Sequence, residues 1–312
     1  MIDKSVAEEI KRLVRYENKS LLDILEKPYK SPKNYPKWEY EVLSFLGKSF
    51  DPYTKDKVNN YAINVANCLI DVDFPTYYVS KELAISLWNT NSSLHTKDLN
   101  IAQPSVLFIF PFNCIKTPEN DDLTSIGIVS TKKNSSLQEL YNYHGNGLLA
   151  SSLFLRNKNH KTWYIYGIHN TSSFNQGLAQ DNYQEYFIDN FGIPVQIEDE
   201  NETKFLDKFR SFCFNLMFIL EKRPELIEEV KIQPKGFGNT NKKDFRNPIW
   251  LGKDYKIKYV YEKSNLQEER KGNPKKVHFR KGYYRRQKYG KDLQKEKIIF
   301  IDPVIVNAKK EN

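Results

Sequence analysis

Residues 201–222, NETKFLDKFRSFCFNLMFILEK, decide the fold of this 312-residue chain. Apolar side chains recur in them at steps of three and four residues, which is the spacing of one face of an α-helix. Pro224 follows and ends the pattern. We predict a long amphipathic helix whose apolar stripe packs in the core against a sheet. The stripe comprises Phe205, Phe209, Phe212, Leu216, Ile219 and Leu220.

Short runs upstream of this helix have the composition of β-strands. β-branched and aromatic residues dominate them, and polar turns such as residues 118–122 separate them. Runs of this kind, each joined to the next by a turn, are typical of an antiparallel meander. We predict a central antiparallel sheet from residues 106–110, 123–130, 149–155 and 163–168.

The amino-terminal part of the chain has helical patterning. Ser5 and Glu8 have the spacing of a capping box, and apolar residues keep helical spacing from Val58 to Leu69. Residues 31–36, SPKNYP, read as a linker. The predicted fold class is therefore α+β, with amino-terminal helices, a central antiparallel sheet with a long amphipathic helix, and a basic carboxy-terminal β-hairpin.

Charge is divided unevenly along the chain. Residues 231–312 hold 23 Lys and Arg against 9 Asp and Glu, a net charge of +14, whereas residues 1–230 have a net charge of −5. We therefore divide the chain into a body, residues 1–232, which would recognise a partner or peptide, and a basic region, residues 233–312, which would contact RNA or the ribosome. Such a region suits an anionic partner, RNA or DNA, and a solvated basic tail is the alternative.

Several classes of protein are excluded by composition. The amino terminus lacks the apolar core of a signal peptide, and the longest apolar stretch, residues 212–220, is interrupted by Asn215, so we expect no membrane span. Cys68, Cys114 and Cys213 form neither a disulfide framework nor a metal-ligand pattern. We expect a soluble cytoplasmic protein that binds no metal and no small-molecule cofactor.

The densest group of chemistry-bearing residues is 275–291, KKVHFRKGYYRRQKYGK. Residues 297–306, KIIFIDPVIV, read as a second strand, and a turn around residues 290–294 would join the two into a β-hairpin. If the first strand continues through Gly282, alternation places four side chains on one face. These are His278, Arg280, Tyr284 and Arg286.

Cations interleaved with tyrosines are suited to single-stranded RNA. Arginine binds phosphate bidentately, and tyrosine stacks on bases. A hairpin whose Arg and Tyr side chains merely cover the body is the structural alternative. The candidate nucleic-acid-binding residues are Arg280, Lys281, Tyr284, Arg285, Arg286 and Lys288.

The same hairpin allows a hypothesis of catalysis. A metal-independent ribonuclease needs a general acid or base and cations that stabilise the transition state. His278 is the candidate, with Arg280, Arg286 or Tyr284 beside it. The other four histidines lie in distant segments, so no acid–base pair is evident and a binding protein is favoured over an enzyme.

This carboxy-terminal pattern resembles the signature of a type V-A anti-CRISPR family with plasmid-borne and phage-borne relatives. The resemblance covers a His-x-Arg-basic-Gly-aromatic core and a strand that ends near Pro-x-x-Val-Asn. Two positions depart from the family pattern, since Tyr283 stands in place of a histidine and Tyr284 in place of a tryptophan. The positions carried over from the motif are His278, Arg280, Gly282, Tyr284, Pro303, Val306 and Asn307.

The resemblance implies a protein of mobile genetic elements that lowers production of a CRISPR nuclease. Its relatives recognise the emerging amino-terminal peptide of the nuclease and promote loss of the message. We therefore expect a binding protein with a protein or nascent-peptide target, and with RNA or the ribosome as second partner. A metal-independent ribonuclease and a plasmid DNA-binding accessory protein are the alternatives.

Overall fold

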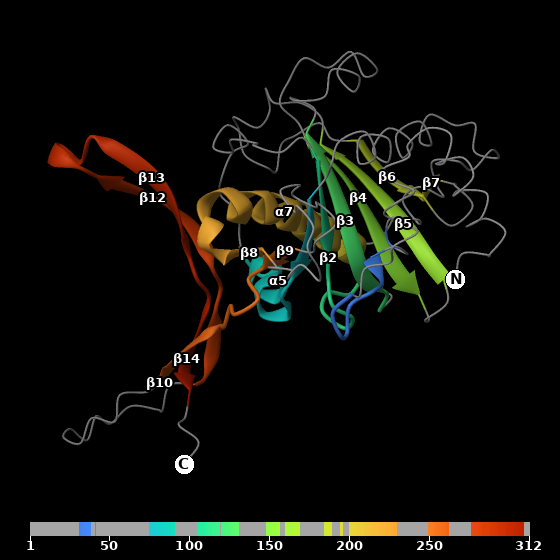
Figure 1. The fold of residues 1–312 in the computed structure, drawn as a ribbon, viewed down its shortest axis with the longest axis horizontal. Helices are drawn as coiled ribbons and strands as arrows, with labels where there is room; N and C mark the ends of the chain where they lie inside the picture. The colour runs from blue at the N-terminus through green and yellow to red at the C-terminus, as the bar shows by residue number, and fades with distance from the viewer. Residues whose placement is uncertain are drawn as a thin grey trace, which may run out of the picture.

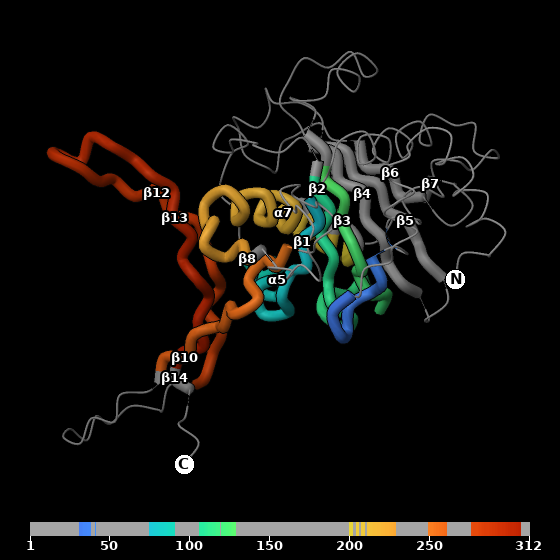
Figure 2. Tube along the Cα trace, in the orientation of Figure 1, coloured from blue at the N-terminus to red at the C-terminus, as the bar shows by residue number. Residues whose placement is uncertain are grey.

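The computed structural model describes residues 31–38, 41, 75–90, 105–118, 120–130, 148–156, 160–168, 184–188, 194–195, 200–229, 249–261 and 276–308 (Figures 1 and 2). Helices and sheets are both present, as the α+β prediction requires. The predicted amino-terminal helices lie outside the described residues. Within the ranges given above, no helix combines the length and apolar character needed to cross a lipid bilayer.

A nine-stranded sheet forms the centre of the body, in the order β7-β6-β5-β4-β3-β2-β1-β9-β8. The predicted meander is confirmed, because β2 to β5 pair in antiparallel order. The sheet is nevertheless mixed, since β1 pairs in parallel with both β2 and β9. The strands are β1 (Thr76–Val79), β2 (Ser105–Ile109), β3 (Asp122–Ser130), β4 (Leu148–Arg156), β5 (His160–Ile168), β6 (Gln184–Ile188), β7 (Pro194–Val195), β8 (Ile227–Glu229) and β9 (Ile249–Leu251).

Two helices cover one face of this sheet (Figure 1). The predicted helix is α7 (Glu200–Lys222), and α5 (Lys81–Trp88) packs beside it. Phe212 and Phe218 are fully buried and join residues of β1 to β3 in one core cluster. Burial of such side chains contributes roughly 2–3 kcal/mol each. The long helix is thus held by the aromatic stripe that its sequence predicts.

The opposite face of the same strands is covered by residues 31–38 and 41. Tyr35 makes edge contacts with Tyr78 of β1 and Trp250 of β9. Glu41 is buried and accepts hydrogen bonds from the hydroxyls of Thr124 and Ser125, at 3.0 and 2.7 Å. Strands β1 to β3 are therefore covered on both faces, as is typical of parallel strands such as β1 and β2.

The carboxy-terminal hairpin is present as predicted, with its turn at Gly290–Gln294. β12 (Tyr283–Tyr289) pairs with β13 (Lys295–Ile301), and further along β11 (His278–Arg280) pairs with β14 (Val304–Ala308). β10 (Lys258–Tyr261) adds to β14 to give a three-stranded sheet. We call residues 278–308 the ribbon. Figure 1 shows it beside the ends of the helices, with one end reaching away from the body.

The basic region is not separated from the body by a break in the fold. β9 follows residue 232, yet it lies inside the nine-stranded sheet between β1 and β8. Tyr284 and Phe300 of the ribbon belong to the same core cluster as α7. The division at residue 232 therefore stays a prediction about function.

Asn215 of α7 connects three elements in the core. Its side-chain Nδ2 donates to the carbonyl oxygens of Leu87 and Thr90 at the end of α5, at 2.9 and 3.1 Å. The main-chain carbonyl oxygen of Asn215 accepts a hydrogen bond from the hydroxyl of Tyr284 at 3.3 Å. The side chain thus supplies donors to helix-terminal carbonyls that are buried away from water.

We predict that Asn215→Ala lowers the free energy of unfolding by about 2–4 kcal/mol, because the buried carbonyls of Leu87 and Thr90 both lose the side-chain donor and Leu87 keeps only a backbone donor, Thr90 N at 3.1 Å. Ser211→Ala, one turn earlier on α7, removes a hydrogen bond to the Asp207 carbonyl at the surface and is expected to cost under about 0.5 kcal/mol. Urea unfolding of the two variants measures the difference. Equal costs would contradict the role of Asn215.

Candidate functional site

The ribbon bends where it passes the end of α5. The β-pairing stops at Lys281 and Gly282 on one strand and at Asp302 and Pro303 on the other. A Cβ atom on Gly282 would lie 2.8 Å from Thr90 Oγ1 and 3.1 Å from the carbonyl oxygen of Ile301. Glycine is therefore required here for close approach. This gives a physical reason for one position of the carboxy-terminal motif.

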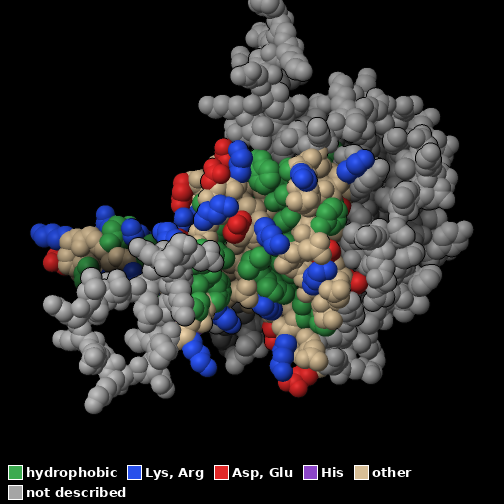
Figure 3. Space-filling view, turned by 90° about the horizontal axis from the view of Figure 1, so that it is seen from below, with side chains coloured by type: hydrophobic (Ala, Val, Ile, Leu, Met, Phe, Trp, Pro, Cys, Tyr) green, Lys and Arg blue, Asp and Glu red, His purple; other side chains and the backbone are tan. Residues whose placement is uncertain are grey.

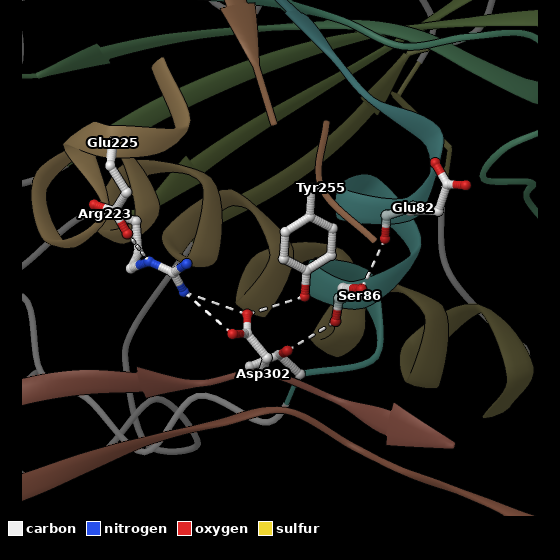
Figure 4. A network of polar contacts seen from close by, with 7 residues as sticks. Glu82, Ser86, Arg223, Glu225, Tyr255 and Asp302 are labelled. Atoms are coloured by element: carbon white, nitrogen blue, oxygen red, sulfur yellow. Dashed lines mark hydrogen bonds and ion pairs between the residues drawn. The ribbon is translucent and has the colours of Figure 1, made fainter. Parts of the chain in front are cut away.

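A polar network fastens the bend to the body (Figure 4). Asp302 accepts hydrogen bonds from Arg223, after the end of α7, at 3.3 and 3.4 Å, and from the Tyr255 hydroxyl at 3.1 Å. Arg223 also pairs with Glu225. Burial opposes the charge of Arg223, but its two carboxylate partners outweigh burial and raise the pKa of the guanidinium. The network fixes the ribbon at its bend.

We predict that Gly282→Ala destabilises the protein by about 1–3 kcal/mol through overpacking at the bend. Thr90→Ala removes the nearest obstructing atom, so Gly282→Ala should cost less in that background than in the native chain. A double-mutant cycle measured by denaturant unfolding gives the comparison. The same cost in both backgrounds would show that the predicted crowding is absent.

One face of the ribbon packs on the body. Tyr284 and Phe300 are opposite each other in the register and are 4% and 7% exposed, and their rings pack at a tilt with their centres 5.1 Å apart. The Tyr284 ring also contacts Phe218 of α7 at 5.6 Å. Burial raises the pKa of the Tyr284 hydroxyl well above its usual range, so it stays protonated and donates to Asn215. In this structure the ring belongs to the core and cannot stack on a base, contrary to its expected role.

The opposite face of the ribbon is turned outward, and we call its residues the outer face. Tyr283 and Tyr289 are each 42% exposed, and Arg285 lies between them on the same strand face. Lys297 lies over the Tyr289 ring at 5.4 Å. The outer face comprises Tyr283, Arg285, Gln287 and Tyr289 of β12 with Lys295, Lys297, Ile299 and Ile301 of β13.

The turn of the ribbon extends these cations beyond the body. Six Lys and Arg stand against Asp292 and Glu296 in residues 283–301, a net charge of +4. Arg286 pairs with Glu296 at 3.1 Å, and no carboxylate of the described residues pairs with Lys288, Lys291 or Lys295. Figure 3 shows Lys and Arg side chains at the end of the ribbon and over the described surface of the body.

The structure distributes the remaining predicted residues along the ribbon. Arg280 and Lys281 are exposed at the bend, whereas Arg286 and Lys288 are exposed near the turn, on the face opposite to Arg285. They do not form one cluster with His278. The predicted common face is broken, because β11 ends at Arg280 and β12 begins at Tyr283.

His278 is exposed, and its Nδ1 lies 3.1 Å from the carbonyl oxygen of Lys276. Among the described side chains, none is hydrogen-bonded to this imidazole. The geometry therefore adds no acid–base partner to the catalytic hypothesis. Among all the residues that the structure describes, no group of three or more His, Cys, Asp or Glu is arranged to hold a metal ion.

The remaining motif residues also belong to the ribbon. Pro303 and Val304 are buried beside the bend, whereas Val306 is half-buried in β14 opposite His278. Asn307 lies in the same strand. The motif residues around the bend pack against the rest of the protein. A large part of the motif therefore serves to attach the ribbon to the body.

Several residues of the site were missed by sequence reasoning. Lys208 of α7 lies 4.9 Å from the centre of the Trp88 ring and donates to Asn89 at 3.3 Å. Burial and the nearby Lys281 lower its pKa, so α7 brings a further cation close to the bend. Tyr289, Lys295 and Lys297 were also missed. Counting the register outward from the predicted turn would have placed these three on the same face as Arg285.

The fold and site define an α+β protein that carries an attached, cationic and aromatic ribbon. The chain belongs to the anti-CRISPR type V subtype A2 family, whose family model matches residues 77–308. The match begins in β1 and ends at the last residue of β14, so it spans the sheet, the helices and the ribbon. No curated protein and no solved structure matches the chain. Its broad function is therefore that of an anti-CRISPR protein.

Proposed function

We propose that this anti-CRISPR protein recognises a nascent protein target with its body and with the three-stranded sheet β10-β14-β11, which we call the root of the ribbon. The outer face of the ribbon holds RNA of the translation machinery. Binding both partners at once would lower expression of the target. The protein acts by binding and needs no chemistry of its own. What supports the proposal most is the outer face, where three cations and two exposed tyrosine rings share a surface turned away from the core.

The outer face has the two elements that single-stranded RNA requires. Exposed tyrosine rings can stack on bases in a sequence-tolerant way, at about 1–3 kcal/mol per base. Arg285, Lys295 and Lys297 can meet the phosphates between them. Tyr284 and Phe300, on the opposite face, attach the ribbon to the body. The outer face can therefore bind RNA while these core contacts stay intact.

The root of the ribbon is apolar, whereas the outer face is cationic. Tyr259, Ile305 and Phe279 lie side by side across β10, β14 and β11. Tyr259 is 56% exposed and Phe279 is 39% exposed. We call these three residues the apolar row. Exposed aromatic residues at this density are typical of protein-binding surfaces, so the row is our candidate contact for the protein target.

We predict that the triple variant Arg285→Ala, Lys295→Ala, Lys297→Ala weakens binding to single-stranded RNA by about tenfold or more and reduces the salt slope by up to about 2, since three phosphate contacts are lost. Fluorescence anisotropy with a labelled RNA at several salt concentrations measures both quantities. The chain should stay folded, because all three side chains are exposed.

The matched control is Lys204→Ala, Lys253→Ala, Lys256→Ala, which removes the same charge outside the ribbon, where each lysine pairs with a carboxylate. This control should change the salt slope little. If both triple variants bind RNA alike, net charge rather than the outer face explains binding, and the proposal fails. Tighter binding to duplex DNA than to RNA at physiological salt would support a DNA-binding accessory protein instead.

We predict that Tyr259→Ser with Phe279→Ser abolishes the lowering of nuclease expression in cells while RNA affinity changes by less than about threefold, because the apolar row serves the protein target and not the phosphates. Western blotting measures the amount of nuclease in cells that express either the native chain or the double variant. Undiminished lowering by the double variant would remove the apolar row from the account.

A further inference from the structure

The turn of the ribbon presents an apolar side chain at its far end. Leu293 is 60% exposed, which is the largest exposure among the large apolar side chains that the structure describes. It lies between Lys291 and Lys295, at the part of the ribbon that reaches furthest from the body (Figure 1). Core packing therefore does not account for a leucine at this position.

The backbone of the turn makes the leucine more unusual. Asp292 and Leu293 both have a φ of +55°, and Gln294 N lies 3.5 Å from the carbonyl oxygen of Lys291. Two successive residues with positive φ fit the twist of a two-stranded ribbon, but Asn and Gly are the residues that favour them. A leucine there is strained and remains exposed. Strain without burial points to a role outside folding.

The surroundings of Leu293 indicate the chemical class of its partner. Lys288, Lys291 and Lys295 surround the turn, and no carboxylate of the described residues pairs with them. A ligand for this tip must offer an apolar slot flanked by negative charge. Stacked nucleic-acid bases between two phosphate backbones have this arrangement, and apolar wedges enter such stacks in other nucleic-acid-binding proteins.

We infer that Leu293 is a wedge that inserts between stacked bases of a structured RNA, while the surrounding lysines hold its phosphates. This rests on the proposed function, because the outer face must first bring RNA to the ribbon. The wedge adds a second activity to binding, namely the local opening of a base stack. The protein would recognise the structured RNA by how easily two neighbouring bases unstack, not by hydrogen bonds to base edges.

The test uses the full-length protein and an RNA stem-loop with 2-aminopurine in the stem, whose fluorescence rises on unstacking. The native chain should raise the fluorescence, and Leu293→Gly should lose most of that gain. The Kd of Leu293→Gly should rise by no more than about tenfold, because the phosphate contacts remain. Glycine relieves the strain at a positive φ, so the variant should fold at least as well as the native chain.

Val277→Gly is the matched control, since Val277 is an aliphatic residue of similar exposure, 54%, that directly precedes the ribbon at the end opposite to the turn. It should leave the fluorescence gain intact. Equal gains from the native chain and Leu293→Gly would overturn the wedge and leave the proposed function standing. If the native chain binds neither this stem-loop nor a single-stranded RNA, the proposed function fails and the wedge fails with it. If it binds the single-stranded RNA but not the stem-loop, the wedge alone is overturned. If Leu293→Gly keeps the gain but no longer lowers nuclease expression in cells, the tip fits a protein pocket and the inference is wrong.

Discussion

The packing of Tyr284 and Phe300 against Phe218 is the interaction on which the site depends. An isolated two-stranded ribbon is marginally stable in water. Here one face is buried against α7, and the Tyr284 hydroxyl reaches the backbone of Asn215, which itself caps α5. The same burial leaves the other face outward. Stability and presentation therefore come from one set of contacts.

The ribbon changes character along its length, and this suggests how two partners can be held at once. Its root has the apolar row, its middle is attached through Gly282 and Asp302, and its far half is cationic. Under the proposed function, a protein target and an RNA would contact different parts of the ribbon. The family match spans the body and the ribbon together, which is consistent with a single working unit.

Much of the fold, including the hairpin that carries the site, could be predicted from local patterns, but which face of the hairpin is buried could not. The four runs of the meander and the stripe of α7 have clear periods, so their elements were found. β1 and β9 are only four and three residues long and pair across some 170 positions, as Tyr77 does with Ile249, so no local signal reveals them. Alternation separates Tyr284 from Tyr283, but only the packing of α7 shows which of the two is buried.

Ultraviolet crosslinking of the full chain to a single-stranded RNA, followed by mass spectrometry of the adducts, tests the central claim most directly. We expect adducts on Tyr283 and Tyr289, the exposed rings of the outer face, and none on the buried Tyr284. Adducts confined to the nine-stranded sheet, with the ribbon unmodified, would contradict it.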